Sequence, residues 1–199
     1  MKRSALFLTL LVLAATPLLA QGWEANMVHH INGWQGGLIH DYSSFISKTE
    51  PYVALGVPLV MAAVGWKSKD RQLMQDALFV GTSVVGTFAF TMGLKYVVNR
   101  TRPYEAYPDL IHPHSVEPDP SFPSGHTASA FALATSLCIR YPKWYVIAPS
   151  ALWVSSVAVS RMYEGVHYPT DVLAGAALGV GCTIGSHYLS KWLNKKLFD

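Results

Sequence analysis

Five uncharged apolar stretches constrain the fold of this chain more than any other feature of its sequence. None contains Asp, Glu, Lys or Arg, and they cover residues 51–66, 77–94, 127–139, 144–160 and 172–190. Charged residues make up only 14% of the 199-residue chain, against about 25% in an ordinary soluble domain. The stretches predict an all-α fold, a helical membrane bundle with five core transmembrane helices. Each is shorter than the roughly 20 residues that usually cross a bilayer, and 127–139 suits a buried helix of a soluble protein equally well.

The first twenty residues have the layout of a secretory signal. Lys2 and Arg3 precede a mainly apolar run, and Ala20 stands before the polar Gln21. This order predicts a signal peptide over residues 1–20 and places the chain that follows outside the cytoplasm. An uncleaved signal anchor is the alternative, because Leu18 is poorly suited to its position three residues before the expected cleavage point.

Residues 21–50 carry apolar side chains at helical spacing. From Trp23 to Phe45 these side chains recur at steps of three and four, and Gly36-Gly37 interrupts the series. The pattern predicts two short amphipathic helices in the outer membrane interface, or else a surface helix of a soluble protein. We therefore expect a periplasmic amphipathic segment over residues 21–50, followed by a membrane domain over residues 51–199.

The basic residues indicate which ends of the apolar stretches face the cytoplasm. If the first stretch runs inward, ten of the fifteen Lys and Arg residues lie on the cytoplasmic side, as the positive-inside rule requires. The basic residues that remain outside are Lys48, Lys95, Arg100, Arg102 and Arg161. No cluster of Lys and Arg is interleaved with aromatic residues, so no nucleic-acid partner is expected.

Three segments on the outer side contain the candidate reactive residues. Lys95 is separated by six residues from Arg102-Pro103, Pro123-Ser124-Gly125-His126 opens the third stretch, and the last segment holds Arg161, His167 and Asp171. Cations, two imidazoles and one carboxylate at a single membrane face are a suitable composition for a phosphate-ester site. Fixed cations neutralise the charge of a phosphoryl group in transfer. Ser124 is a good helix cap, and the free amides after it form an anion cradle that Gly125 leaves open to close approach.

In all three motifs, and in their order, the chain resembles the membrane-type members of the type 2 phosphatidic acid phosphatase family. That family shares its site with vanadium haloperoxidases and periplasmic nonspecific acid phosphatases. The resemblance implies that His167 is the nucleophile and forms a phosphohistidine, while Asp171 fixes its tautomer. It also implies that His126 protonates the leaving alkoxide and then activates water. The implied phosphate-binding residues are Lys95, Arg102, Ser124, Gly125 and Arg161, and no metal or other cofactor is required.

Together these expectations predict one function and leave alternatives open. We expect a phosphatase that hydrolyses a lipid phosphomonoester or pyrophosphate at the periplasmic face of a bacterial inner membrane. Family resemblance offers phosphatidic acid, phosphatidylglycerophosphate, polyprenyl pyrophosphate and the phosphates of lipid A as substrates. The alternatives are a soluble periplasmic acid phosphatase and a noncatalytic lipid-phosphate binding or transport protein. Vanadate-dependent halide oxidation is the least favoured reading, because apolar segments suit a lipid substrate better.

Several residues outside the motifs have more than one interpretation. Arg100 is either a supporting cation or an interface anchor. The acidic segment 104–122 lacks Lys and Arg and contains four prolines, so it is expected to be an irregular loop beside the pocket or a plain connector. His112 and His114 lack a third metal ligand at convincing spacing, which favours solvated loop histidines. Cys138 and Cys182 lie in apolar stretches and are expected to be small buried residues outside any disulfide framework.

Overall fold

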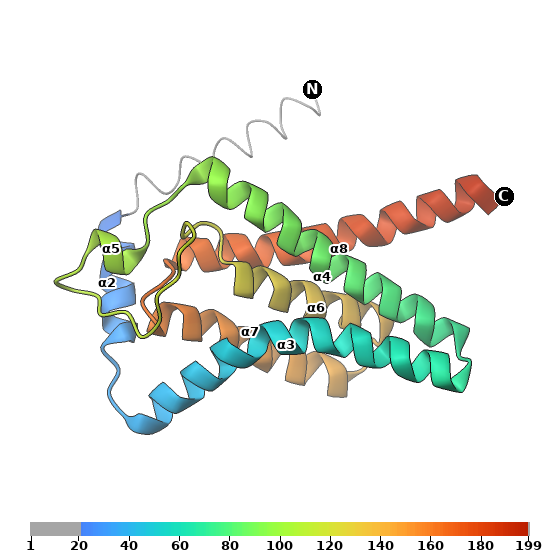
Figure 1. Ribbon diagram of the computed structural model, residues 1–199, viewed down its shortest axis with the longest axis horizontal. Coiled ribbons are helices and arrows are strands. Elements are labelled where there is room, and N and C mark those ends of the chain that lie inside the picture. The colour runs from blue at the N-terminus through green and yellow to red at the C-terminus, as the bar shows by residue number, and fades with distance from the viewer. Residues whose placement is uncertain (1–20, 199) are drawn as a thin grey trace.

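Seven helices occupy residues 21–198, the part of the chain that the computed structural model describes (Figure 1). They are α2 (Gln21–Asn32), α3 (Gly37–Ser68), α4 (Arg71–Val98), α5 (Pro103–Ala106), α6 (Gly125–Arg140), α7 (Trp144–Tyr163) and α8 (Pro169–Phe198). Each of the five long helices α3, α4, α6, α7 and α8 contains one predicted apolar stretch, and residues 21–198 include no strand. The all-α prediction is therefore confirmed, while the predicted signal or anchor lies outside the described residues.

Helix α3 corrects the prediction of two short interfacial helices over residues 21–50. The first of them corresponds to α2, but the second is continuous with the first apolar stretch, and Pro51 lies inside the joined helix. Buried residues recur at steps of three and four on both sides of this proline, at Ser47, Glu50 and Ala54. Packing of one continuous face therefore outweighs the loss of a backbone hydrogen bond at proline. Figure 1 shows α3 bending along its length, as helices do at proline.

Capped helix ends place the motif residues. Asp70 caps α4 by accepting a hydrogen bond from the Leu73 amide at 3.1 Å, and the helix ends at Asn99 in the left-handed region, with φ 49°. Lys95 therefore lies in the last turn of α4. Ser124 caps α6 and accepts from the Thr127 amide at 3.4 Å, so Gly125 opens that helix.

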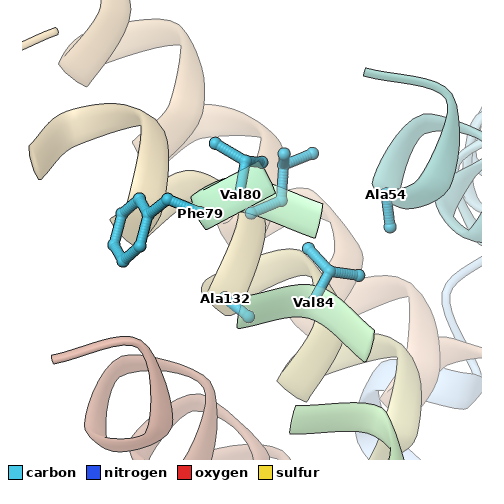
Figure 2. Packing of buried hydrophobic residues seen from close by; sticks show 6 residues of the cluster. Ala54, Phe79, Val80, Val84 and Ala132 are labelled. Atoms are coloured by element: carbon cyan, nitrogen blue, oxygen red, sulfur yellow. The ribbon is translucent and has the colours of Figure 1, made fainter. Parts of the chain in front are cut away.

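Helix α6 lies at the centre of the bundle and packs against α3, α4, α7 and α8 (Figure 1). Two glycines of α8, Gly175 and Gly179, let this helix approach α6 closely. A Cβ atom at position 175 would lie 2.6 Å from the carbonyl oxygen of Ser124, and a Cβ atom at position 179 would lie 2.4 Å from the carbonyl oxygen of Ala128. Figure 2 shows an apolar cluster contributed by α3, α4 and α6. The start of α6 is therefore held in place from several sides.

The outward faces of the long helices are rich in exposed apolar side chains. Examples on α3, α4 and α7 are Leu55, Leu59, Val60, Leu78, Val85, Phe88 and Leu152. Within the described residues, however, only the segment Arg71–Ala106 is long and apolar enough to cross a membrane by length and composition. Helix α6 has 16 residues, fewer than the roughly 20 needed to span. The number of five transmembrane helices therefore stays a prediction.

Candidate active site

The three sequence motifs converge at one end of the bundle, where α4 and α7 end and α6 and α8 begin. The residues Lys95, Arg102, Arg161, His167 and Asp171 are all buried there, with 0–2% of their surface exposed. A cavity of about 660 Å³ is lined by six of the eight predicted site residues, Lys95, Arg102, Gly125, His126, Arg161 and His167. Ser124 and Asp171 lie behind this lining.

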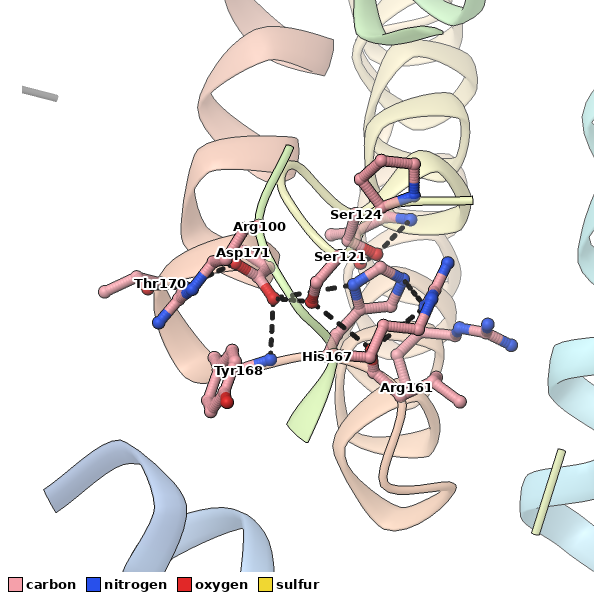
Figure 3. A network of polar contacts seen from close by, with 12 residues as sticks. Arg100, Ser121, Ser124, Arg161, His167, Tyr168, Thr170 and Asp171 are labelled. Atoms are coloured by element: carbon pink, nitrogen blue, oxygen red, sulfur yellow. Dashed lines mark hydrogen bonds and ion pairs between the residues drawn. The ribbon is translucent and has the colours of Figure 1, made fainter. Parts of the chain in front are cut away.

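The two ring nitrogens of His167 face different groups. Its Nδ1 atom makes no hydrogen bond. Oδ2 of Asp171 lies 3.6 Å from this nitrogen, which is beyond hydrogen-bond distance (Figure 3). Its Nε2 atom lies 3.5 Å from Nη1 of Arg102. Burial, and after it the charges of Arg161 and Arg102, lowers the pKa of His167 well below its ordinary value. A neutral imidazole with Nε2 directed at the cations is what nucleophilic attack on a phosphoryl group requires.

Asp171 is the centre of a polar network behind His167. Its carboxylate accepts hydrogen bonds from the Tyr168 amide at 2.8 Å, from Arg100 at 2.6 Å and from the Ser121 hydroxyl (Figure 3). Its backbone oxygen accepts from the Ser124 amide at 3.0 Å, which links this network to the start of α6. Four fixed contacts of this kind hold Asp171 in one position beside the imidazole.

Arg100 is a supporting cation of this network, which decides between the two interpretations of the sequence. It bridges Asp171 and Glu24 at 2.6 Å each, and its guanidinium lies 3.9 Å from the centre of the Tyr168 ring. Burial alone would lower the pKa of Arg100, but Asp171 and Glu24 raise it above its ordinary value. Glu24 is fully buried and also accepts from the Thr170 amide at 3.1 Å. Helix α2 thus supports the site, a role for which its amphipathic sequence gives no signal.

The acidic loop places carboxylates on the predicted phosphate-binding cations. Asp119 bridges Lys95 and Arg102 at 3.1 and 2.6 Å, and Glu117 pairs with Arg161 at 2.6 Å. Burial alone would raise the pKa of Asp119, but Lys95 and Arg102 hold it below its ordinary value. The segment 104–122 is therefore part of the site and not a plain connector. Its two carboxylates occupy the cations that a phosphate group would need.

Arg161 is held by a second set of contacts at the end of α7. Its guanidinium donates to Glu164 at 2.8 Å and to the Ser47 hydroxyl, and Ser47 in turn donates to Glu164 at 3.0 Å. Ser47 comes from α3, 114 residues earlier in the sequence. Neither Ser47 nor Glu164 belongs to a motif, so no sequence pattern points to either of them.

The start of α6 presents Gly125 and His126 to the cavity, whereas the Ser124 hydroxyl is engaged within the helix cap. It lies 2.9 Å from the Thr127 hydroxyl and accepts from the Thr127 amide. Gly125 packs beside the Lys95 side chain, whose Cε atom would lie 3.9 Å from a Cβ at position 125. The free amides at this helix start, together with three cations, form a surface suited to phosphate oxygens.

The remaining histidines and cysteines fall into other environments. His114 stacks on Tyr163 with ring centres 4.8 Å apart, and no group of three or more potential ligands suited to a metal occurs in the described part of the chain. Cys138 and Cys182 are free, but both are half-buried and not fully buried as the sequence suggested.

The comparisons with known proteins agree on one protein family. The family model described as "PAP2 superfamily" matches residues 76–195. The Lipid A 1-phosphatase of Porphyromonas gingivalis is 29% identical over an alignment of 195 residues that covers 94% of this chain and 38% of that protein. The Undecaprenyl-diphosphatase of Sulfolobus acidocaldarius is 35% identical over 108 residues, 50% of each chain. This chain therefore spans half or less of the length of these two relatives.

A solved structure extends the similarity to the whole fold. The transmembrane PAP2 type phosphatidylglycerolphosphate phosphatase from Bacillus subtilis superposes with a TM-score of 0.73, covering 98% of both chains at 24% sequence identity. At that identity the likeness concerns the fold, and it includes the arrangement of helices that brings the three motifs together.

Proposed function

The chain belongs to the PAP2 superfamily, and from this membership we propose that it is a membrane lipid phosphatase that works through a phosphohistidine at His167. One observation carries the proposal: the Nε2 atom of a buried His167 faces Arg102 at 3.5 Å, with Asp171 fixed behind the opposite nitrogen. This arrangement offers a nucleophile beside a group of cations. It is the pairing that phosphoryl transfer without a metal ion requires.

Substrate binding begins with the displacement of two carboxylates. A phosphate group replaces Asp119 on Lys95 and Arg102, and it replaces Glu117 on Arg161. Its oxygens then also accept hydrogen bonds from the free amides at the start of α6. The cations are already buried and held in place, so the site reorganises mainly by moving the loop carboxylates, which are 22% and 26% exposed.

Chemistry follows in two steps. In the first, Nε2 of His167 attacks phosphorus, the bond to the leaving oxygen breaks, and His126 donates a proton to that oxygen. The positive charge that develops on His167 is stabilised by the nearby Asp171 carboxylate. In the second step, His126 takes a proton from water as the water oxygen attacks phosphorus and the N–P bond breaks. Inorganic phosphate leaves and both histidines return to their starting state.

The apolar wall of the cavity favours a lipid as the leaving group. Besides the cations, the cavity is lined by side chains of α3 and α4 that include Ala54, Leu55, Val84, Val85, Phe88 and Met92. Such a wall matches a hydrocarbon chain. The exposed apolar faces of the same helices suit a bilayer. We infer a lipid phosphomonoester or diphosphate as the substrate class, in agreement with the names of the relatives.

The basic residues support a site on the outer face of the inner membrane. Lys67, Lys69, Arg140 and Lys143 lie at the α3–α4 and α6–α7 connections, at the end of the bundle opposite the site (Figure 1). By the positive-inside rule that end faces the cytoplasm. The site then opens to the periplasm.

Phosphate release from a lipid panel tests the proposal. The purified full chain is assayed in mixed micelles with phosphatidic acid, phosphatidylglycerophosphate, a polyprenyl diphosphate and lipid A, and with glucose 6-phosphate as a water-soluble comparison. We expect lipid hydrolysis in the wild type, its loss in His167→Gln and its retention in the matched control His30→Gln, because His30 is exposed on α2. Preference for glucose 6-phosphate would refute the lipid assignment, and full activity of His167→Gln would refute the nucleophile.

A further inference from the structure

A second cavity of about 510 Å³ adjoins the active-site cavity. One wall is a single face of α3, with His40, Ser44, Ser47 and Lys48 at helical spacing, and the opposite wall comes from the acidic loop and the end of α7. Four residues line both cavities, namely Pro51, Glu117, His126 and Arg161. The proposed general acid His126 therefore stands at the junction of the two spaces.

The second cavity contains a cation without a carboxylate partner. Of the five basic residues predicted to lie outside, Lys95, Arg100, Arg102 and Arg161 all form ion pairs in the structure. Lys48 forms none with any residue among those described, although its side chain is exposed and lines this cavity. The two carboxylates in the lining, Glu117 and Glu164, both pair with Arg161. Lys48 is thus the basic residue of this lining whose ammonium group makes no ion pair in the described part of the chain.

The two cavities also differ in the chemistry of their linings. The active-site cavity continues into the apolar side chains of α3 and α4, whereas the second cavity is lined by hydroxyl, imidazole and charged groups. A leaving oxygen beside His126 would stand between them. A hydrocarbon chain would fit the apolar part of the first cavity, and polar or charged atoms next to that oxygen would find partners in the second.

We propose that the second cavity binds an anionic group in the leaving portion of the substrate, with Lys48 as its cation. The inference rests on the proposed lipid phosphatase function and adds the substrate class. Favoured substrates carry a second negative group, a phosphodiester or another phosphate, near the phosphate that is removed. Lipids whose leaving alcohol is neutral gain nothing from Lys48.

Two lipids that differ in this respect test the proposal. Hydrolysis of phosphatidic acid releases neutral diacylglycerol, whereas hydrolysis of phosphatidylglycerophosphate releases a lipid that retains a phosphodiester anion. Each is presented to the full chain at the same surface concentration in neutral detergent micelles. In Lys48→Gln we expect kcat/KM for phosphatidylglycerophosphate to fall about 3- to 5-fold, the size expected of a solvent-accessible ion pair, with phosphatidic acid unchanged. Lys48→Arg should restore the wild-type ratio.

Lys67→Gln is the matched control, because Lys67 is exposed at the other end of the same helix and far from the cavity. It should leave both substrates unchanged. An equal loss on both lipids in Lys48→Gln, or no loss on either, would overturn the role of Lys48 while leaving the phosphatase assignment intact. If the wild type hydrolyses neither these two lipids nor the polyprenyl diphosphate and lipid A, the proposed function is refuted, and this inference with it.

Discussion

Replacing Asp119 with asparagine should make the enzyme bind inorganic phosphate more tightly. The carboxylate of Asp119 occupies Lys95 and Arg102 at 3.1 and 2.6 Å, and an incoming phosphate has to displace it. Asparagine keeps the size and shape of the side chain but removes its charge. Because both cations are only 2–3% exposed, they have little access to water as a replacement partner. The free state of the variant is therefore raised in free energy relative to the phosphate complex.

The size of this effect follows from the two contacts that are lost. A hydrogen bond to a charged group contributes about 1.5–3 kcal/mol, and the carboxylate is 22% exposed, so partial screening reduces the sum. A net gain for phosphate of about 1–3 kcal/mol corresponds to roughly 5- to 150-fold tighter binding. The same change leaves buried charge less compensated, so the thermal stability of the phosphate-free variant should fall.

Competitive inhibition measures the effect directly. The inhibition constant of inorganic phosphate is determined for wild type and Asp119→Asn on the same lipid substrate, with Asp109→Asn as a control. Asp109 is an exposed acid in the same loop and forms no ion pair among the described residues. We expect a lower inhibition constant in Asp119→Asn alone. An unchanged or higher constant would mean that Asp119 supports phosphate binding and does not compete with it.

Three further predictions concern packing, topology and metal dependence. Gly179→Ala should destabilise the fold by about 1–3 kcal/mol, because the added Cβ would lie 2.4 Å from a carbonyl oxygen of α6. Gly181→Ala is the control and should leave stability unchanged, because a Cβ at position 181 would have no atom within 4 Å. Equal melting temperatures of the two variants in detergent would contradict this prediction. Cysteine introduced at Asp109, with Cys138 and Cys182 changed to alanine, should react with an impermeant thiol reagent in intact spheroplasts, and labelling only after lysis would reverse the topology. Phosphatase activity should survive EDTA and fall with vanadate, which mimics the transferring phosphoryl group. Loss of activity on chelation, with recovery when a divalent cation is added, would contradict a metal-free mechanism.

The sequence was most informative where local rules decide the structure. Uncharged stretches become helices because their side chains find partners in a core or at an apolar surface, and Ser124 starts α6 because its hydroxyl satisfies a free amide. The motif residues Lys95, His126 and His167 also met as expected, since each stands at a helix end and the helices alternate in direction. What local rules missed was the continuity of α3 across Pro51, which packing with other helices determines.

The partners of the site residues could not be read from the sequence for a physical reason. Glu24 reaches Arg100 from 76 residues away, and the Ser47 hydroxyl meets Arg161 across 114 residues. These contacts depend on how α2 and α3 lie against the end of the bundle. Asp119 and Glu117 belong to a loop with no regular spacing, so their acidic character was visible, but their positions on the cations were not.

Trapping of the phosphorylated enzyme tests the central claim most directly. The full chain is mixed with a lipid substrate that carries ³²P in its phosphate group, quenched within the first turnovers and separated under denaturing conditions. The account predicts covalent label that is stable to alkali and labile to acid, as a phosphohistidine is. It also predicts slower decay of the label in His126→Gln, where hydrolysis of the intermediate is slowed, and no label in His167→Gln. Label that persists in His167→Gln, or lipid hydrolysis by His126→Gln without any label, would contradict it.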